Sequence, residues 1–326
     1  MHIVKVWEVV VLAALLGVVN AFDVPARQSF LIEMVSRDDL MNAIALNSSM
    51  FNGARVIGPA IAGITVAKIG EGWCFFANAV SYIAVIVGLL MMHLSPFEEQ
   101  KHKTSPYEHI KEGFDYVQKT APMMALVMLI GVVSLVAVPY SVLMPVFADR
   151  ILHRGAHGLG ILMGASGVGA LLGALTLAMR RGVKGLGHTV GYSAGAFGVS
   201  LILFAVSKSF WLSVVMLVPV GYGVMLQMSG SNTLIQSMVP DKLRGRAMAV
   251  YTMMFMGMAP LGSLLAGGLA DRVGAPWTVS LGGVGAIAGA WWFLKNLPKW
   301  QVEARQLIAA QGISPSAAAE NRDAMS

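Results

Sequence analysis

Arg55 is the side chain whose surroundings most need a chemical explanation. It stands in the middle of a long apolar run, 42–68. If that run crosses a membrane, a guanidinium at its centre is costly unless it is paired or hydrated. Two interpretations stay open: Arg55 binds an anionic group or couples to a proton in a cavity, or it forms a structural ion pair with an Asp or Glu.

Amide side chains inside the apolar runs form the second set of candidates. Uncharged polar groups in membrane helices either line a path for substrate and water or hydrogen-bond to a neighbouring helix. Both readings stay open for each of these residues. The substrate or proton pathway candidates are Asn47, Asn78, Gln227 and Asn232, with Asn20, Asn42 and Gln236 as further members of the set.

No residue set in the sequence argues for an enzyme. A Gly-x-x-x-x-Gly-Lys-Ser/Thr loop does not occur, which speaks against an ATP-driven pump. His153 and His157 are four residues apart but have no third ligand nearby in the sequence, and Cys74 is the single cysteine. The sequence therefore predicts no enzymatic activity, no metal site and no cofactor.

The composition predicts a membrane protein. Hydrophobic residues make up 56% of the chain and charged residues 12%, whereas a soluble domain has about 25% charged residues. Apolar runs long enough to cross a bilayer as helices recur between short polar loops. We expect an all-α integral membrane fold with nine spans near 6–25, 42–68, 73–94, 122–147, 157–179, 187–206, 209–231, 245–270 and 275–297.

An internal duplication indicates two pseudo-symmetric halves. Segment 34–73 aligns without a gap on segment 238–277, at a shift of 204 positions. Repeats of this kind build many membrane carriers. The least expected identities are four glycines and a tryptophan in one register: Gly53/Gly257, Gly58/Gly262, Gly63/Gly267, Gly70/Gly274 and Trp73/Trp277.

The basic residues predict the orientation of the chain. When loop 26–41 is placed in the cytoplasm, sixteen Lys and Arg residues fall inside and six outside, as the positive-inside rule requires. The N-terminus is then outside and the C-terminus cytoplasmic. The predicted parts are an N-terminal bundle of three spans over 1–94, a cytoplasmic linker over 95–121 with a short surface helix near 107–119, a six-helix bundle over 122–300 and a disordered tail over 301–326.

Five segments carry a family resemblance: NAFDVPARQ at 20–28, LNS at 46–48, ARVIGPAIAG at 54–63, FANAVSY at 76–82 and VPDKLRGR at 239–246. They resemble the major facilitator superfamily, and within it the branch of bacterial exporters that includes the enterobactin exporter. The resemblance covers nearly all of residues 3–297.

The resemblance implies two six-helix bundles that work by alternating access, often driven by protons. The nine spans would be helices four to twelve of that fold, so three further helices are expected ahead of Met1. A late start, a truncated gene and a nine-span protein all remain open. The family's Gly-x-x-x-Asp-Arg-x-Gly-Arg-type loop would also lie ahead of Met1. Arg180-Arg181-Gly182 in the second half resembles it only loosely.

Two groups of residues carry expected roles in gating. Gly58, Pro59, Ala62 and Gly63 resemble the antiporter motif Gly-Pro-x-x-Gly-Gly, with Ala62 in place of one glycine. Pro kinks a helix and small residues allow close approach, although ordinary helix packing has the same signature. The candidate loop charges are Asp23, Arg27, Asp241, Arg244 and Arg246, which are either gating groups or a solvated positive-inside surface.

The sequence thus predicts a secondary transporter of the inner membrane that exports a small amphiphilic compound, drug-like or siderophore-like, in exchange for protons. Its expected partners are that small molecule, protons and the lipid bilayer, with no nucleic acid. The oligomeric state stays open. The alternative is a truncated, non-transporting membrane protein or a partner-binding subunit.

Overall fold

The computed structural model describes residues 71–91, 106–180 and 182–311, together with positions 8, 11, 12, 15, 19, 50, 54 and 65. The chain divides into two compact units, 1–55 and 56–326. The described positions of the first unit are all helical. The predicted spans 6–25 and 42–68 lie outside the described residues apart from these positions.

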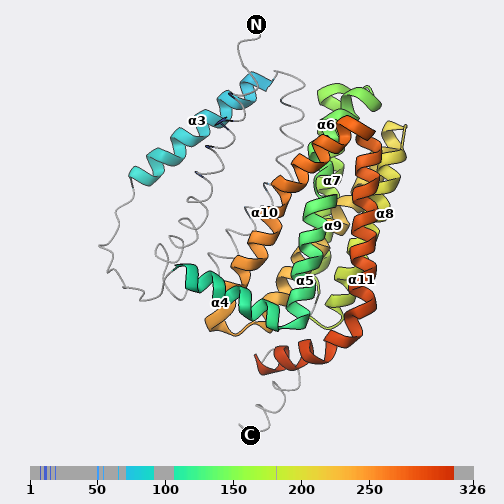
Figure 1. The fold of residues 1–326 in the computed structure, drawn as a ribbon. Coiled ribbons are helices and arrows are strands. Elements are labelled where there is room, and N and C mark those ends of the chain that lie inside the picture. The colour runs from blue at the N-terminus through green and yellow to red at the C-terminus, as the bar shows by residue number, and fades with distance from the viewer. Residues whose placement is uncertain are drawn as a thin grey trace. The chain divides into compact units, whose positions relative to one another are not determined.

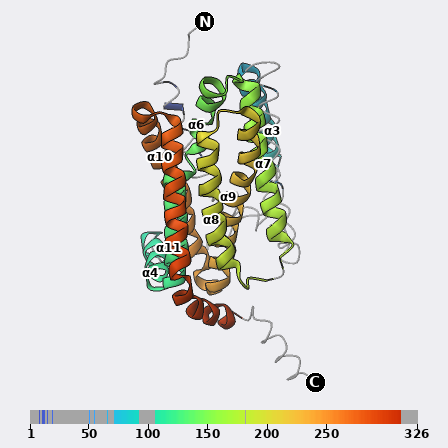
Figure 2. The ribbon, with the colours of Figure 1, turned by 90° about the vertical axis from the view of Figure 1, so that its right-hand side faces the viewer.

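The second unit is helical throughout its described part (Figures 1 and 2). Seven helices of that part are long and apolar enough to cross a membrane, and they coincide with the last seven predicted spans. The all-α membrane fold is therefore confirmed. The elements are α3 (Glu71–Leu90), α4 (Pro106–Lys119), α5 (Ala121–Val132), η1 (Val133–Ala137), α6 (Tyr140–Val146), η2 (Phe147–Ile151), α7 (Gly155–Ala178), α8 (Leu186–Val206), α9 (Phe210–Met238), α10 (Asp241–Val273) and α11 (Ala275–Ala310).

Glycine contacts hold α7, α8, α9 and α11 together. A Cβ on Gly198 of α8 would lie 2.6 Å from the carbonyl oxygen of Gly283 on α11, and a Cβ on Gly283 would lie 2.7 Å from that of Gly198. On α7 and α9, a Cβ on Gly169 would overlap the Val218 carbonyl, and one on Gly221 the Ser166 carbonyl. Lipid offers no hydrophobic drive for helix association, so such close backbone approach supplies the packing energy.

The first helix of this bundle is a continuous span, Ala121–Ile151, interrupted by two π-helical turns. The amide of Val138 donates to the carbonyl of Val133 at 2.9 Å, and that of Leu152 to Phe147 at 2.8 Å. Pro139, which has no amide hydrogen, follows the first turn. Glycines face the widened turn η1: a Cβ on Gly262 of α10 or on Gly282 of α11 would overlap its backbone.

Aromatic side chains fill the centre of the bundle. Phe147, Phe197, Phe204 and Phe293 are among its largest fully buried side chains. The Phe147 and Phe204 rings lie 4.6 Å apart between centroids, which links η2 to α8. Because these rings are spread over α8, α11 and the span Ala121–Ile151, one continuous core joins the helices.

Two segments lie at the end of the bundle that carries the α7–α8 loop. The short helix α4 confirms the surface helix predicted near 107–119, and it packs against α5 and α10 (Figure 1). The last turns of α11 change direction and run across the ends of the other helices (Figure 1). Pro298 lies at this bend and cannot donate to the helix ladder. The sequence predicts a disordered tail from residue 301, whereas α11 continues to Ala310 because its apolar side chains pack on the bundle.

Candidate functional site

Helix α9 carries a stripe of polar side chains on its less buried face. Asn232 and Gln236 pair with each other, since the Gln236 Nε2 donates to the Asn232 Oδ1 at 2.5 Å. Thr233 donates from Oγ1 to the carbonyl oxygen of Ser229 at 2.9 Å. The predicted candidate Asn232 therefore belongs to a hydrogen-bonding surface, here called the α9 stripe: Ser229, Asn232, Thr233 and Gln236.

Gln227 lies elsewhere on the same helix. Gln227 and Asn232 are five positions apart, so their side chains point about 140° apart around the helix axis. The neighbours of Gln227 on its own face, Gly223 and Gly230, pack against Ser193 and Val190 of α8 respectively. Gln227 is 0% exposed, and neither its Nε2 nor its Oε1 has a hydrogen-bond partner within the described part of the chain. The structure thus separates Gln227 from Asn232 and leaves a buried amide unsatisfied among these residues.

The neighbouring helix α10 carries several methionines. The Tyr251 hydroxyl of α10 donates to the Met228 carbonyl of α9 at 2.9 Å, so the two helices meet beside the stripe. Met253 and Met256 are about half exposed, whereas Met254 packs toward Gly131 of α5. Flexible thioether side chains adapt to varied apolar surfaces. The stripe on α9 thus offers hydrogen bonds, and the two exposed methionines on α10 offer an adaptable apolar surface.

A buried pair of hydroxyl groups joins α6 and α7, and no sequence pattern predicts it. The Tyr140 hydroxyl and the Ser166 Oγ are 3.0 Å apart, and either oxygen can donate. Tyr140 is buried, and its ring lies 6.2 Å from that of Phe197. The two hydroxyls satisfy each other inside the bundle, which accounts for a buried tyrosine without assigning it to a ligand.

The predicted loop charges at the start of α10 lie against α4. Arg246 forms an ion pair with Glu112 of α4. A Cβ on Gly113 would lie 2.7 Å from the Arg246 carbonyl oxygen, so the two backbones are in close contact. Arg244 is half-buried, and Asp241 is the first residue of the helix. Burial raises the pKa of the Tyr116 phenol on α4, which keeps it neutral.

We expect Gly113→Ala to loosen α4 from α10. The new methyl group meets backbone rather than a movable side chain, and overpacking of this kind costs about 1–3 kcal/mol. Amide hydrogen exchange within α4 should therefore become faster. Gly245→Ala is the matched control, because a Cβ there meets nothing within 4 Å in the described part of the chain. Equal exchange rates in the two variants would show that α4 is not held through Gly113.

Many predicted site residues lie outside the described part of the chain. Asn78 lies within the described part: it is exposed on α3, and its backbone carbonyl oxygen accepts a hydrogen bond from Ser81 Oγ at 2.7 Å. The predicted site residues outside the described part are Arg55, Asn47, Gly58, Pro59, Ala62, Gly63, Asp23 and Arg27.

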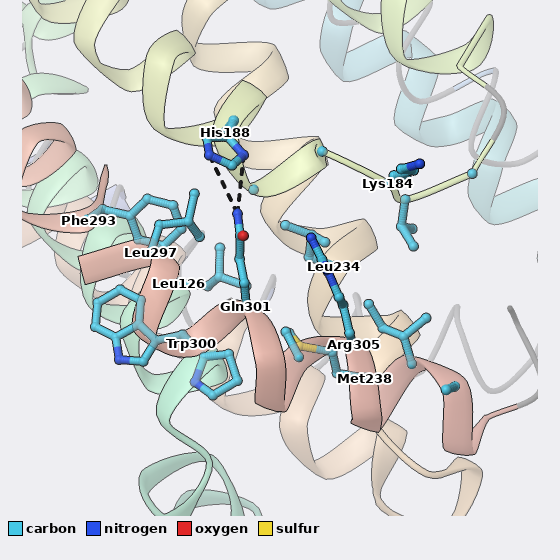
Figure 3. A pocket seen from close by; sticks show the side chains of 18 residues that line it. Leu126, Lys184, His188, Leu234, Met238, Phe293, Leu297, Trp300, Gln301 and Arg305 are labelled. Atoms are coloured by element: carbon cyan, nitrogen blue, oxygen red, sulfur yellow. Dashed lines mark hydrogen bonds between the residues drawn. The ribbon is translucent and has the colours of Figure 1, made fainter. Parts of the chain in front are cut away.

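A pocket of about 730 Å³ lies beneath the bend of α11 (Figure 3). Its walls come from α5, α8, α9, α11 and the α7–α8 loop. Gln301 of α11 points at His188 of α8, with its Nε2 lying 3.3 Å from His188 Nδ1 (Figure 3). Sequence reasoning missed this pocket, because it treated the residues after 300 as a tail.

Two other chemistries find no support within the described residues. No group of three or more His, Cys, Asp or Glu side chains there could hold a metal ion. The letters Gly-x-Ser-x-Gly occur at 191–195, but Ser193 is buried within the helix α8. A nucleophile elbow needs a sharp strand-to-helix turn, so this serine has no catalytic setting.

Comparison with known proteins identifies the family. A family described as transmembrane secretion effector matches residues 1–321. The chain belongs to this family. The resemblance to the major facilitator superfamily is thereby confirmed. With the seven long apolar helices of the described residues, the family match shows a multi-pass membrane protein.

Individual relatives carry the names of siderophore transporters. The chain is 26% identical to the staphyloferrin A transporter of Staphylococcus aureus over 281 residues, which is 86% of this chain and 70% of that one. It is 27% identical to the enterobactin exporter of an Escherichia coli strain over 259 residues, which is 78% of this chain. The chain thus spans only 60% of the length of that exporter.

A solved structure supports the fold alone. A crystal structure of a bacterial homolog to the human lysosomal transporter Spinster, inward-facing and unoccupied, superposes with a TM-score of 0.52 at 14% identity. The match covers 87% of this chain and 75% of that one. At this identity it assigns a transporter-type helical arrangement to this member of the transmembrane secretion effector family, and nothing about its substrate.

Proposed function

We propose that the chain is a secondary active transporter that exports a small amphiphilic, siderophore-like compound by alternating access. The observation that carries this proposal is the family match, which runs along nearly the whole chain. The names of the staphyloferrin A transporter and the enterobactin exporter support a siderophore-like substrate. The six membrane-length helices over 121–310 support a bundle that moves as one half of a carrier.

The division into halves is part of this proposal. Residues 122–300 form the C-terminal bundle, 95–121 the linker and 1–94 the N-terminal half. The ion pair between Glu112 and Arg246, with the close approach of Gly113, supports a linker helix that travels with the C-terminal bundle. The chain lies in the bacterial inner membrane, with the N-terminus outside and the C-terminus cytoplasmic, as its Lys and Arg distribution supports.

The substrate path is proposed to run along the α9 stripe and the exposed methionines of α10. An amphiphile needs both hydrogen-bond partners and an apolar wall. Asn232 and Gln236 supply the first, and Met253 and Met256 the second. Arg55 is the proposed charge for an anionic substrate group or for coupling to protons, since intramembrane arginines are commonly retained for function.

Siderophore secretion tests the proposal. The chain is expressed in an Escherichia coli strain that makes enterobactin but lacks its exporter, and catecholate in the medium is measured under iron limitation. We expect secretion to rise above the empty-vector level, and a protonophore to abolish the increase. Arg55→Ala is expected to reduce it about tenfold or more, the effect of losing a charge contact worth roughly 1.4 kcal/mol or more.

Arg272→Ala is the matched control, because Arg272 is exposed at the end of α10. It should secrete as the unmodified chain does. If the unmodified chain reaches the membrane and secretes nothing, with enterobactin or with a carboxylate siderophore, the transport proposal fails. The non-transporting or partner-binding alternative then applies.

A further inference from the structure

The pocket beneath the bend of α11 combines apolar walls with positive charge. Its apolar lining comes from three helices of the bundle, including the last turns of α11: Leu126, Leu234, Met238, Phe293, Leu297, Trp300 and Ile308. Its basic lining residues are Lys184, His188 and Arg305, and no Asp or Glu is among the described residues that line it.

The basic groups come from two sides of the pocket. Figure 3 shows Gln301 and Arg305 rising from α11 on one side, with His188 on α8 and Lys184 in the α7–α8 loop on the other. The loop that carries Lys184 is fixed by Arg180, which donates to the Lys184 carbonyl at 2.8 Å and to Thr189 Oγ1 at 2.7 Å. Gly182 and Gly185 of this loop adopt φ of 83° and 73°, a region that favours glycine. The basic groups are therefore presented by ordered backbone.

Trp300 and the last turns of α11 form the apolar side of the pocket. Trp300 packs against Trp292 and Phe293, at centroid distances of 5.4 and 5.8 Å. Trp300, Ala304 and Ile308 are spaced by four residues, so one face of the final α11 turns covers the pocket. A volume of about 730 Å³ lies within the range of roughly 300–1,000 Å³ that small-molecule sites occupy.

We infer that this pocket binds one anionic phospholipid, with its phosphate among Lys184, His188 and Arg305 and the start of an acyl chain along Leu297, Trp300 and Ile308. A free inorganic anion would leave the apolar walls without a partner. A membrane supplies anionic amphiphiles at high local concentration, and basic pockets at the cytoplasmic ends of membrane helices bind such headgroups. The basic residues of this site lie on α8, α11 and the α7–α8 loop, whereas the proposed substrate path uses other side chains, those of the α9 stripe and of α10.

Quenching of Trp300 tests this inference. The full chain in neutral detergent is titrated with phosphatidylglycerol dibrominated near the headgroup end of its acyl chains. Tryptophan fluorescence is compared with that of Trp300→Phe to isolate the contribution of Trp300. We expect the phosphatidylglycerol to quench Trp300 at a concentration at least tenfold lower than equally brominated phosphatidylcholine, since each basic residue near a headgroup changes affinity about fivefold.

Three variants separate the pocket from general surface charge. Lys184→Gln with Arg305→Gln should weaken quenching by about twenty-fold or more, at roughly fivefold per charge. Lys295→Gln with Lys299→Gln removes the same number of charges from α11, the helix that also carries Arg305, but outside the pocket lining, and should change little. Ala304→Phe keeps every charge but fills the pocket, and should abolish selective quenching.

Four results would overturn the inference. They are equal quenching by the two lipids, equal weakening by the two double variants, unchanged quenching in Ala304→Phe, and competition by inorganic phosphate at the same concentration as the lipid. The last result would assign the pocket to a free anion. Gel filtration of each variant verifies folding, and siderophore secretion is measured separately, so failure of lipid binding is distinguishable from failure of transport.

Discussion

Gly221→Ala is expected to destabilise the bundle strongly. The new methyl group would overlap the Ser166 carbonyl oxygen on α7, and a carbonyl in a helix cannot turn away as a side chain can. The reciprocal contact of Gly169 with Val218 means that separating the helices breaks two close approaches at once. Overpacking costs about 1–3 kcal/mol and occasionally more, and this position belongs in the upper part of that range. Thermal unfolding in mild detergent should show a Tm several degrees lower.

Gly267→Ala is the matched control for this prediction. Gly267 also lies in a membrane-length helix, but a Cβ there meets nothing within 4 Å in the described structure. Alanine is the better helix former by about 1 kcal/mol, so the Tm should stay the same or rise. Equal Tm changes in Gly221→Ala and Gly267→Ala would show that close backbone contact between α7 and α9 does not stabilise the bundle.

The sequence predicts the positions of the seven described membrane-length helices, because each is a long apolar run between polar loops. It is less successful at their ends. The span predicted to stop at 231 continues as α9 to Met238, since Thr233 and the Asn232–Gln236 pair satisfy their hydrogen bonds within the helix. Pro298 suggests an end to the last helix, yet α11 bends there and continues. Local polarity does not reveal what neighbouring helices can cover.

The repeat marks one glycine without predicting its contact. Gly262 is the second-copy equivalent of Gly58, and in the structure it is the point where α10 meets the π-helical turn η1. The turn itself has no clear sequence signature beyond the nearby Pro139, because a π turn is selected by how the helix fits its neighbours. The ion pair between Glu112 and Arg246 could not be predicted either, since a contact between residues distant in sequence leaves no local pattern.

Replacing the buried amide of Gln227 is expected to stabilise the bundle, whereas Gly221→Ala is expected to destabilise it. Gln227→Met replaces an unpartnered polar group by an apolar one of similar length and should raise the free energy of unfolding by about 1–3 kcal/mol, the desolvation cost of an unsatisfied buried group. Gln236→Met is the matched control on the same helix. Gln236 is exposed and paired with Asn232, so its replacement should change stability by less than about 0.5 kcal/mol. Thermal unfolding of both variants in the same detergent provides the comparison.

Siderophore secretion by Gln227→Met separates packing from function. Sites used for function commonly trade stability for activity. We propose that the Gln227 amide takes a partner in another step of the transport cycle, so we expect Gln227→Met to raise Tm and to lower siderophore secretion. A lower Tm would mean that Gln227 already has a partner in the resting protein. A higher Tm with unchanged secretion would remove Gln227 from the transport pathway and leave it as a structural defect of the α8–α9 interface.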